Sequence, residues 1–218
     1  MRACPQEIKP PKAKRKSDES DIFPFTVAER DAIVEALRAN TFCNKHSAFK
    51  HDHYAGYVEF LFLTGCRPSE AIALQWKNVS RDYSTVSFER ASINTASGRK
   101  MRDGLKTQDR RRFPCNAKLK ALLSSVKPEK YSPEGLVFPG FSGKVLNTAS
   151  FRKTVWKPVL AGLGVEYRKP YQTRHTFITL ALEHGLDAKD VAKLVGNSAE
   201  VIYRHYAASK REVSVPEF

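Results

Sequence analysis

Residues 84–114 differ in pattern from the rest of the chain, and this difference sets the fold class. Residues 85–88 (TVSF) alternate between polar and apolar side chains, which is the period of a strand with one buried face. The dipeptides at 97–98 (Ser-Gly) and 103–104 (Asp-Gly) are typical of tight turns. We predict a small three-stranded antiparallel sheet in this stretch.

The other segments repeat their apolar residues at helical spacing. Thr26 and Glu29 have the spacing of a capping box and predict the start of a helix. Pro68 suits the first turn of another helix, and Gly185 and Gly196 separate the last ones. The expected helices span residues 26–38, 53–63, 68–75, 116–126, 148–163, 173–184, 187–195 and 198–207. The sequence therefore predicts a mixed α+β fold, predominantly helical, in a single domain.

The chain has 218 residues, enough for one domain with a sizeable core. Residues 1–21 have almost no large apolar side chains and include the basic run KPPKAKRK at 9–16. We expect a basic interdomain linker or disordered tail there. The folded domain is expected over residues 22–209, with a C-terminal tail at 210–218.

The charge balance predicts a polyanionic partner. The chain has 37 Lys and Arg against 23 Asp and Glu, a formal net charge of +14. Its cysteines (Cys4, Cys43, Cys66 and Cys115) form no paired motif, which favours a reduced, cytoplasmic protein. No apolar run approaches the roughly 20 residues that span a bilayer, so we expect no membrane partner.

Two arginines are candidate ligands of a phosphate. Arg67 precedes Pro68 at a helix start, where free backbone amides and a guanidinium favour an anion, and Glu70 lies one turn on. An ordinary ion pair at a helix start is the alternative. Arg174 opens a strongly apolar helix and needs either a carboxylate or a ligand phosphate as its partner.

The segments around these arginines resemble those of a known family. They are LFLTGCRPSEA (61–71), YQTRHTF (171–177) and LVGN (194–197), followed by Tyr206. In this order and spacing they resemble the arginine boxes and nucleophile of the tyrosine recombinases, the phage integrase family. The resemblance extends over about residues 23–208 and implies the catalytic domain of that family.

The resemblance implies a role for each matching residue. Tyr206 would attack the scissile phosphate and form a 3′-phosphotyrosine, with no metal, ATP or other cofactor. Arg67 and Arg174 would neutralise the non-bridging oxygens in the transition state. Lys106 would protonate the leaving 5′ oxygen, with Lys100 as the alternative.

Two positions depart from the family pattern. Tyr171 stands where the family usually has histidine, and Asn197 where it usually has histidine or tryptophan. Both can form hydrogen bonds, but neither supplies imidazole chemistry, since a phenol with a pKa near about 10 is a poor base at neutral pH. We expect catalysis to be slowed more than abolished.

Neighbouring residues offer competing roles. Because one helical residue rotates the side chain by about 100°, we expect His175 to point away from Arg174 and to be a supporting, structural residue. The same geometry makes His205 a weak candidate for acting on Tyr206. Tyr203, one turn before Tyr206, is the alternative nucleophile but is more typical of a core or interface aromatic.

Basic side chains predict where DNA would bind. They cluster in the sheet region and on the 148–163 helix, and a solvated surface is the alternative reading for each group. The candidates are Arg99, Lys100, Arg102, Arg110, Arg111, Arg152 and Lys153. The basic run at 9–16 either follows DNA phosphates as well or is merely solvated.

The polar segment that contains Cys43, His46, His51 and His53 has residue types that can bind a metal ion. The spacing matches no common zinc pattern, so a surface loop is favoured and no metal is expected.

The leading hypothesis is a site-specific DNA recombinase or integrase of a mobile element, acting at the nucleoid if bacterial. Its partner would be double-stranded DNA, bound as a tetramer with residues 210–218 passed to a neighbouring subunit, and an upstream DNA-clamping domain is expected. A catalytically decayed DNA-binding protein is the alternative, because Tyr171 and Asn197 interrupt a cooperating site. A topoisomerase-like activity that relaxes supercoils is a third hypothesis.

Overall fold

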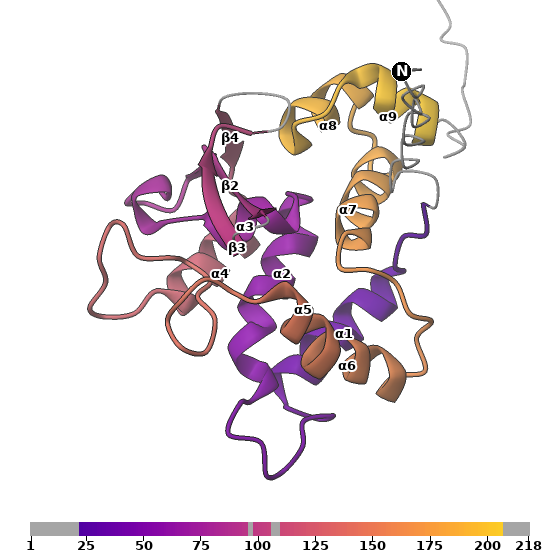
Figure 1. Ribbon diagram of the computed structural model, residues 1–218. Helices are drawn as coiled ribbons and strands as arrows, with labels where there is room; N and C mark the ends of the chain where they lie inside the picture. The colour runs from indigo at the N-terminus through magenta and orange to yellow at the C-terminus, as the bar shows by residue number, and fades with distance from the viewer. Residues whose placement is uncertain (1–21, 96–97, 106–109, 207–218) are drawn as a thin grey trace, which may run out of the picture.

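The computed structural model describes residues 22–95, 98–105 and 110–206 (Figure 1). The N-terminal half holds α1 (Val27–Arg38), the 3-10 turn η2 (His51–Tyr54), α2 (Ala55–Thr64), α3 (Pro68–Ala73) and the 3-10 turn η3 (Trp76–Asn78). The strands follow as β1 (Thr85–Phe88), β2 (Arg90–Thr95), β3 (Gly98–Asp103) and β4 (Arg111–Pro114). The rest is helical: α4 (Ala117–Val126), α5 (Thr148–Phe151), the π-helical η4 (Arg152–Trp156), α6 (Lys157–Gly162), α7 (Gln172–Glu183), α8 (Ala188–Val195) and α9 (Ala199–Tyr206). The fold is predominantly helical with small antiparallel ladders, as the sequence predicts.

The capping box at α1 is confirmed. The hydroxyl of Thr26 accepts from the backbone N–H of Glu29 at 3.1 Å, and the Glu29 carboxylate accepts from the backbone N–H of Thr26 at 2.8 Å. The two bonds satisfy amides that a helix start otherwise leaves open.

The strands pair differently from the prediction of one three-stranded sheet. Among the described residues, β1 pairs with β4 and β2 pairs with β3, each antiparallel, in two ladders. Residues 111–114, which the sequence suggested only as the end of the stretch, alternate between buried and exposed side chains and form the fourth strand. Val86 lies opposite Phe113, and both are buried. Burial of these apolar side chains explains why the chain returns to β1.

The predicted helix over residues 148–163 is interrupted by η4. Pro158 has no N–H, so it leaves the carbonyl of Thr154 without its helical donor. The ring of His51 takes that place, with its Nε2 3.1 Å from the Thr154 oxygen. The Lys157 N–H bonds to Arg152, five residues back, which is the π-helical spacing.

Helix α2 lies at the centre of the main core and ends at the turn that positions the site. Its residues are buried almost all round, and it contacts α1, α4 and α7. Gly65 ends α2 with a left-handed φ of 58°, and a Cβ there would lie 2.5 Å from the ring of Phe177. A glycine is needed here because it permits both the turn and the close approach to α7.

A second, smaller core joins the last helices. It contains Ile178 of α7, Val191 and Val195 of α8, and Ile202 and Tyr206 of α9. Phe177 packs against both cores. In Figure 1, α7, α8 and α9 form one side of the molecule in orange and yellow, next to the short segment that leads into α1. Among the described residues, no helix is long and apolar enough to cross a membrane.

Candidate active site

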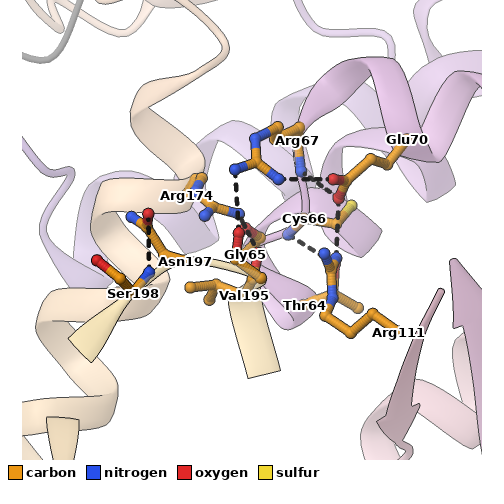
Figure 2. Close-up of polar contacts among 11 residues, drawn as sticks. Thr64, Gly65, Cys66, Arg67, Glu70, Arg111, Arg174, Val195, Asn197 and Ser198 are labelled. Carbon is orange, nitrogen blue, oxygen red and sulfur yellow. Dashed lines mark hydrogen bonds and ion pairs between the residues drawn. The ribbon is translucent and has the colours of Figure 1, made fainter. Parts of the chain in front are cut away.

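Arg67 lies at the entrance to α3, directly before Pro68. Its guanidinium donates to the Glu70 carboxylate at 2.9 Å and to the carbonyl of Gly196 at 3.0 Å (Figure 2). Its backbone N–H also donates to Glu70, at 3.0 Å. The side chain is therefore fixed between α3 and the end of α8 while it stays partly exposed.

Glu70 is buried, with 1% of its surface exposed, and it pairs with two arginines. Besides Arg67, it accepts from the guanidinium of Arg111 in β4 at 2.8 Å. Burial acts to raise the pKa of the Glu70 carboxyl, but the charges and hydrogen bonds of Arg111 and Arg67 outweigh it and the net shift is downwards. The carboxylate is thus held in its charged form.

Arg174 is the most deeply buried cation of the site, with 1% of its surface exposed. Its Nη1 donates to the carbonyls of Gly65 at 3.0 Å and Val195 at 2.6 Å, so it joins the end of α2 to the end of α8. Its Nη2 is buried and has no hydrogen-bond partner among the described residues. Burial lowers the pKa of this guanidinium. A buried donor left open in this way suits an anionic ligand.

The three guanidiniums outnumber their carboxylate. In the described part of the chain, Arg67 and Arg111 form ion pairs with Glu70, whereas Arg174 bonds to backbone carbonyls and has no ion pair. Buried charge that is not fully paired is costly, and a bound phosphate would offset the excess. The arrangement therefore favours a phosphate next to Arg67 and Arg174.

The candidate nucleophile lies beside Arg174. A narrow cavity of about 10 Å³ is lined by Tyr171, Arg174, His175, Asn197, His205 and Tyr206, together with Ile22, Ile178 and Val201. Tyr171 also lines a larger cavity of about 440 Å³ with Arg67. The structure thus brings Tyr171, Arg174, Asn197 and Tyr206 together, with Arg67 on the other side of Tyr171.

Tyr206 ends α9 with only 7% of its surface exposed, and its hydroxyl contacts Nδ1 of His175. This contact of His175 with Tyr206 was not expected from the sequence. Helical rotation does turn His175 from Arg174, but α9 packs on that face of α7 and brings Tyr206 to it. Tyr203 is 50% exposed and does not line the cavity.

Asn197 follows the glycine that ends α8. Its side-chain oxygen accepts from the backbone N–H of Ser198 at 3.2 Å (Figure 2), which leaves the amide N–H₂ available as a donor. Gly196 before it has a φ of 69°, and a Cβ there would lie 2.3 Å from the guanidinium of Arg111. The end of α8 is thus held between Arg67 and Arg111.

Lys106 lies outside the described residues. The residue before it, Leu105, is buried in the main core. The alternative, Lys100, is exposed on β3.

The predicted DNA-binding residues divide into two groups. Lys100, Arg102, Arg110, Arg152 and Lys153 are exposed, whereas Arg99 lies in β3 and its side chain is outside the described part. Arg111 is an error of the prediction, because it is buried, pairs with Glu70 and lies 4.4 Å from the centre of the Phe88 ring. Strand alternation explains this, since Arg111 shares the inward face with Phe113 while Arg112 points outwards. The alternation of a strand over residues 111–114 was the sequence signal that could have predicted an inward-facing Arg111.

Arg168 is a buried arginine that no sequence pattern indicates. It donates to both oxygens of Glu29 at 2.8 and 2.9 Å and to the Pro24 carbonyl at 3.1 Å. Its guanidinium also lies 3.9 Å from the centre of the Phe23 ring. It fixes the segment before α1 to the domain. In the described residues, no group of histidine, cysteine and acidic side chains could hold a metal ion.

Comparison with known proteins places the chain in one family. A model of the Phage integrase family matches residues 29–212. The chain is similar to an integrase of Streptomyces ambofaciens, 26% identical over 199 residues, which cover 83% of this chain and 48% of the relative. It is also similar to the tyrosine recombinase XerD of Vibrio vulnificus, 26% identical over 166 residues, which cover 70% of this chain and 48% of that protein. The chain spans about half the length of these curated relatives.

Solved structures show the same fold. The Tn1549 transposon integrase in complex with a circular intermediate DNA has a TM-score of 0.69 at 18% identity, covering 87% of this chain and 62% of that one. The catalytic domain of bacteriophage HP1 integrase has a TM-score of 0.57 at 16% identity, covering 87% of this chain and 89% of that one. Since residues 29–212 include the arginine cluster, Asn197 and Tyr206 as well as most of the chain, the chain belongs to the phage integrase family.

Proposed function

We propose that this domain cleaves and rejoins DNA strands at specific sites through a 3′-phosphotyrosine on Tyr206. The observation that carries the proposal is the open, buried donor of Arg174 in the cavity that Tyr206 lines. Next to Arg174, the guanidiniums of Arg67 and Arg111 share the single carboxylate of Glu70. Such a cluster favours a phosphate, and the phenol beside it is a nucleophile that needs no metal.

In the proposed reaction, the Tyr206 oxygen attacks the scissile phosphorus and the bond to the 5′ oxygen breaks. Arg67 and Arg174 hold the non-bridging oxygens, and the amide of Asn197 and the phenol of Tyr171 add hydrogen bonds. Lys106 supplies the proton that the 5′ oxygen takes up. The phosphotyrosine keeps the energy of the phosphodiester, so attack by a 5′ hydroxyl restores DNA.

Phosphate entry needs a change in the position of α9. The cavity between Arg174 and Tyr206 has a volume of about 10 Å³, roughly the space that one water molecule needs and too little for a phosphate group. We infer that DNA binding separates α9 from α7 enough for the phosphate to reach both arginines. The small core that joins these helices is the packing that would have to loosen.

The proposed partner is double-stranded DNA. The relatives in solved structures include the XerH recombinase bound to its difH substrate and the Tn1549 integrase with transposon DNA. The exposed basic residues of β3, β4 and η4 would contact the phosphates. We further propose a mobile-element integrase at the nucleoid, with an N-terminal DNA-clamping domain and a tetramer joined through residues 210–218. Light scattering of the complex on a full recombination site tests the tetramer.

Covalent trapping tests the proposed function. The protein, with its upstream domain, is incubated with nicked suicide duplexes from candidate attachment sites, and an SDS-resistant adduct is expected. Tyr206→Phe should abolish it, whereas Tyr203→Phe, one turn earlier and exposed, should retain it. Confirmed DNA binding without any adduct would favour the alternative of a catalytically decayed DNA-binding protein. Relaxation of arbitrary plasmids without site preference would favour the topoisomerase-like route.

A further inference from the structure

His175 is a buried histidine in direct contact with the proposed nucleophile. Its Nδ1 contacts the hydroxyl of Tyr206, and the two rings are stacked with centroids 5.9 Å apart. Only 5% of His175 and 7% of Tyr206 are exposed. The contact joins α7 to α9 next to the place where Arg174 would hold the phosphate.

A phenol in this position must lose its proton when it attacks phosphorus. The family position expected to supply an imidazole holds Tyr171, whose ring lies 5.3 Å from that of His175. Neutral imidazole is the better acceptor at neutral pH, since histidine ordinarily titrates near about 6.5 and tyrosine near about 10. His205 is adjacent to Tyr206 on α9, so its side chain leaves the helix about 100° from that of Tyr206, and it also lines the cavity.

The surrounding charges suit an imidazole that is neutral before DNA binds. The other ionisable groups of this cavity are Tyr171, Arg174, His205 and Tyr206 itself. Behind Arg174 lie Arg67 and Arg111, paired with the one carboxylate, Glu70. An imidazolium beside this excess of positive charge is disfavoured until a phosphate adds negative charge. The imidazole can therefore accept a proton at the step in which the phosphate is attacked.

We propose that His175 accepts the proton of Tyr206 during strand cleavage, which rests on the proposed function of Tyr206 as the nucleophile. The Tyr206 oxygen forms its bond to phosphorus as its proton moves to Nδ1 of His175, while Nε2 keeps the other ring proton. The bond to the 5′ oxygen breaks, and that oxygen takes its proton from Lys106. In rejoining, His175 returns the proton to Tyr206 as the phosphotyrosine bond breaks.

The test compares variants at position 175 in single-turnover formation of the covalent adduct. Asparagine places a hydrogen-bonding atom near the position of Nδ1 but is not basic. His175→Asn should slow cleavage by about 10²-fold to 10⁴-fold, the usual contribution of a general base. It should also remove the fall in rate at acid pH that protonation of the imidazole causes. A cleavage rate in His175→Asn close to that of the parent would show that hydrogen bonding alone suffices, and would overturn the proposal.

Two histidines provide matched controls. His184 lies on the same helix, exposed, with its Nδ1 2.7 Å from the carbonyl of Leu180. His184→Asn should leave both the rate and the pH profile unchanged. His205→Asn should retain the acid limb, because His205 lines the cavity without being the acceptor. Loss of that limb in His205→Asn alone would transfer the role to His205 and overturn the proposal.

A modified substrate separates the two proton transfers. A 5′-bridging phosphorothiolate releases a thiolate that needs no proton from the protein. The defect of His175→Asn should persist on this substrate, since His175 acts on the nucleophile. If the sulfur removes the defect, His175 acts on the leaving group and the proposal is wrong. A faster adduct in His175→Ala than in the parent would also overturn it, because the contact would then restrain Tyr206.

A measurement without DNA keeps the proposal distinct from the proposed function. With 3-fluorotyrosine at position 206, the ¹⁹F resonance should follow a titration of the parent protein that disappears in His175→Asn and stays in His184→Asn. A resonance insensitive to His175 would refute the contact itself. Absence of adduct in the parent, with this titration intact, would instead refute the nucleophilic function of Tyr206.

Discussion

Glu70 has the most demanding environment of any single residue in the site. It is buried between Arg67 and Arg111, and its pair with Arg111 lies almost wholly out of water. Removing one partner of such a pair leaves the others charged and desolvated, which costs far more than the pair itself contributes. The stability of the domain and the position of Arg67 therefore depend on the same carboxylate.

Glu70→Gln should lower the free energy of unfolding by about 3 kcal/mol, because two guanidiniums lose their counter-charge. The exposed pair of Glu200 with Arg204 on α9 provides the control. Glu200→Gln should change stability by less than about 1 kcal/mol. Urea unfolding at neutral pH measures both. Equal losses in the two variants would contradict the buried role of Glu70.

The pH dependence of the same variant follows from the lowered pKa of Glu70. A carboxyl whose folded pKa lies below its ordinary value of 4.5 contributes its full stabilisation above that pH. The contribution is lost as the pH falls through the lower folded value, since protonation removes the charge. The stability difference between the parent and Glu70→Gln should therefore be constant near neutral pH and shrink below pH 4.5. Urea unfolding of both proteins at decreasing pH measures this difference. A difference that stays constant below pH 4.5 would contradict the prediction.

At the scale of elements, the turn after α2 sets the distance between the two arginine-bearing helices. Gly65 approaches the ring of Phe177 on α7, and its carbonyl accepts from Arg174. The turn thus carries Arg67 to the start of α3 while it keeps Arg174 against the end of α2. A change in this turn should alter both arginines together.

Gly65→Ala should destabilise the domain by about 2 to 4 kcal/mol, from left-handed strain and the clash with Phe177. Gly185 isolates the first contribution, since its φ is 87° and a Cβ there would meet nothing within 4 Å. Gly185→Ala should cost about 1 kcal/mol. Thermal or urea unfolding gives both values. A Gly65→Ala loss no larger than that of Gly185→Ala would show that the approach to Phe177 is relaxed at little cost.

For the whole molecule, the distribution of charge separates binding from stability. Exposed basic side chains on β3 and η4 face solvent, whereas Arg111 and Arg168 are buried and ion-paired. The formal net charge of +14 counts exposed and buried basic residues alike. Only the exposed ones could release counter-ions from bound DNA.

Replacing Lys153 by Gln should weaken DNA binding and reduce the salt slope of log K by about 0.9 if the side chain neutralises one phosphate. Lys193 on α8 is an exposed control that pairs with Asp190 at 3.1 Å. Lys193→Gln should leave the slope unchanged. Fluorescence anisotropy over a range of salt concentrations measures it. An unchanged slope in Lys153→Gln would place η4 outside the DNA interface.

The sequence by itself determined the helical class, the α1 capping box and the antiparallel character of the strand region, because each depends on local periodicity or on residues a few positions apart. It also marked Arg67, Arg174 and Tyr206 through their resemblance to a family. Only the tertiary structure decided that Arg111 is an internal partner of Glu70, that β4 returns to β1, and that His175 contacts Tyr206. These contacts join residues 41 and 31 positions apart, and packing between elements brings them together.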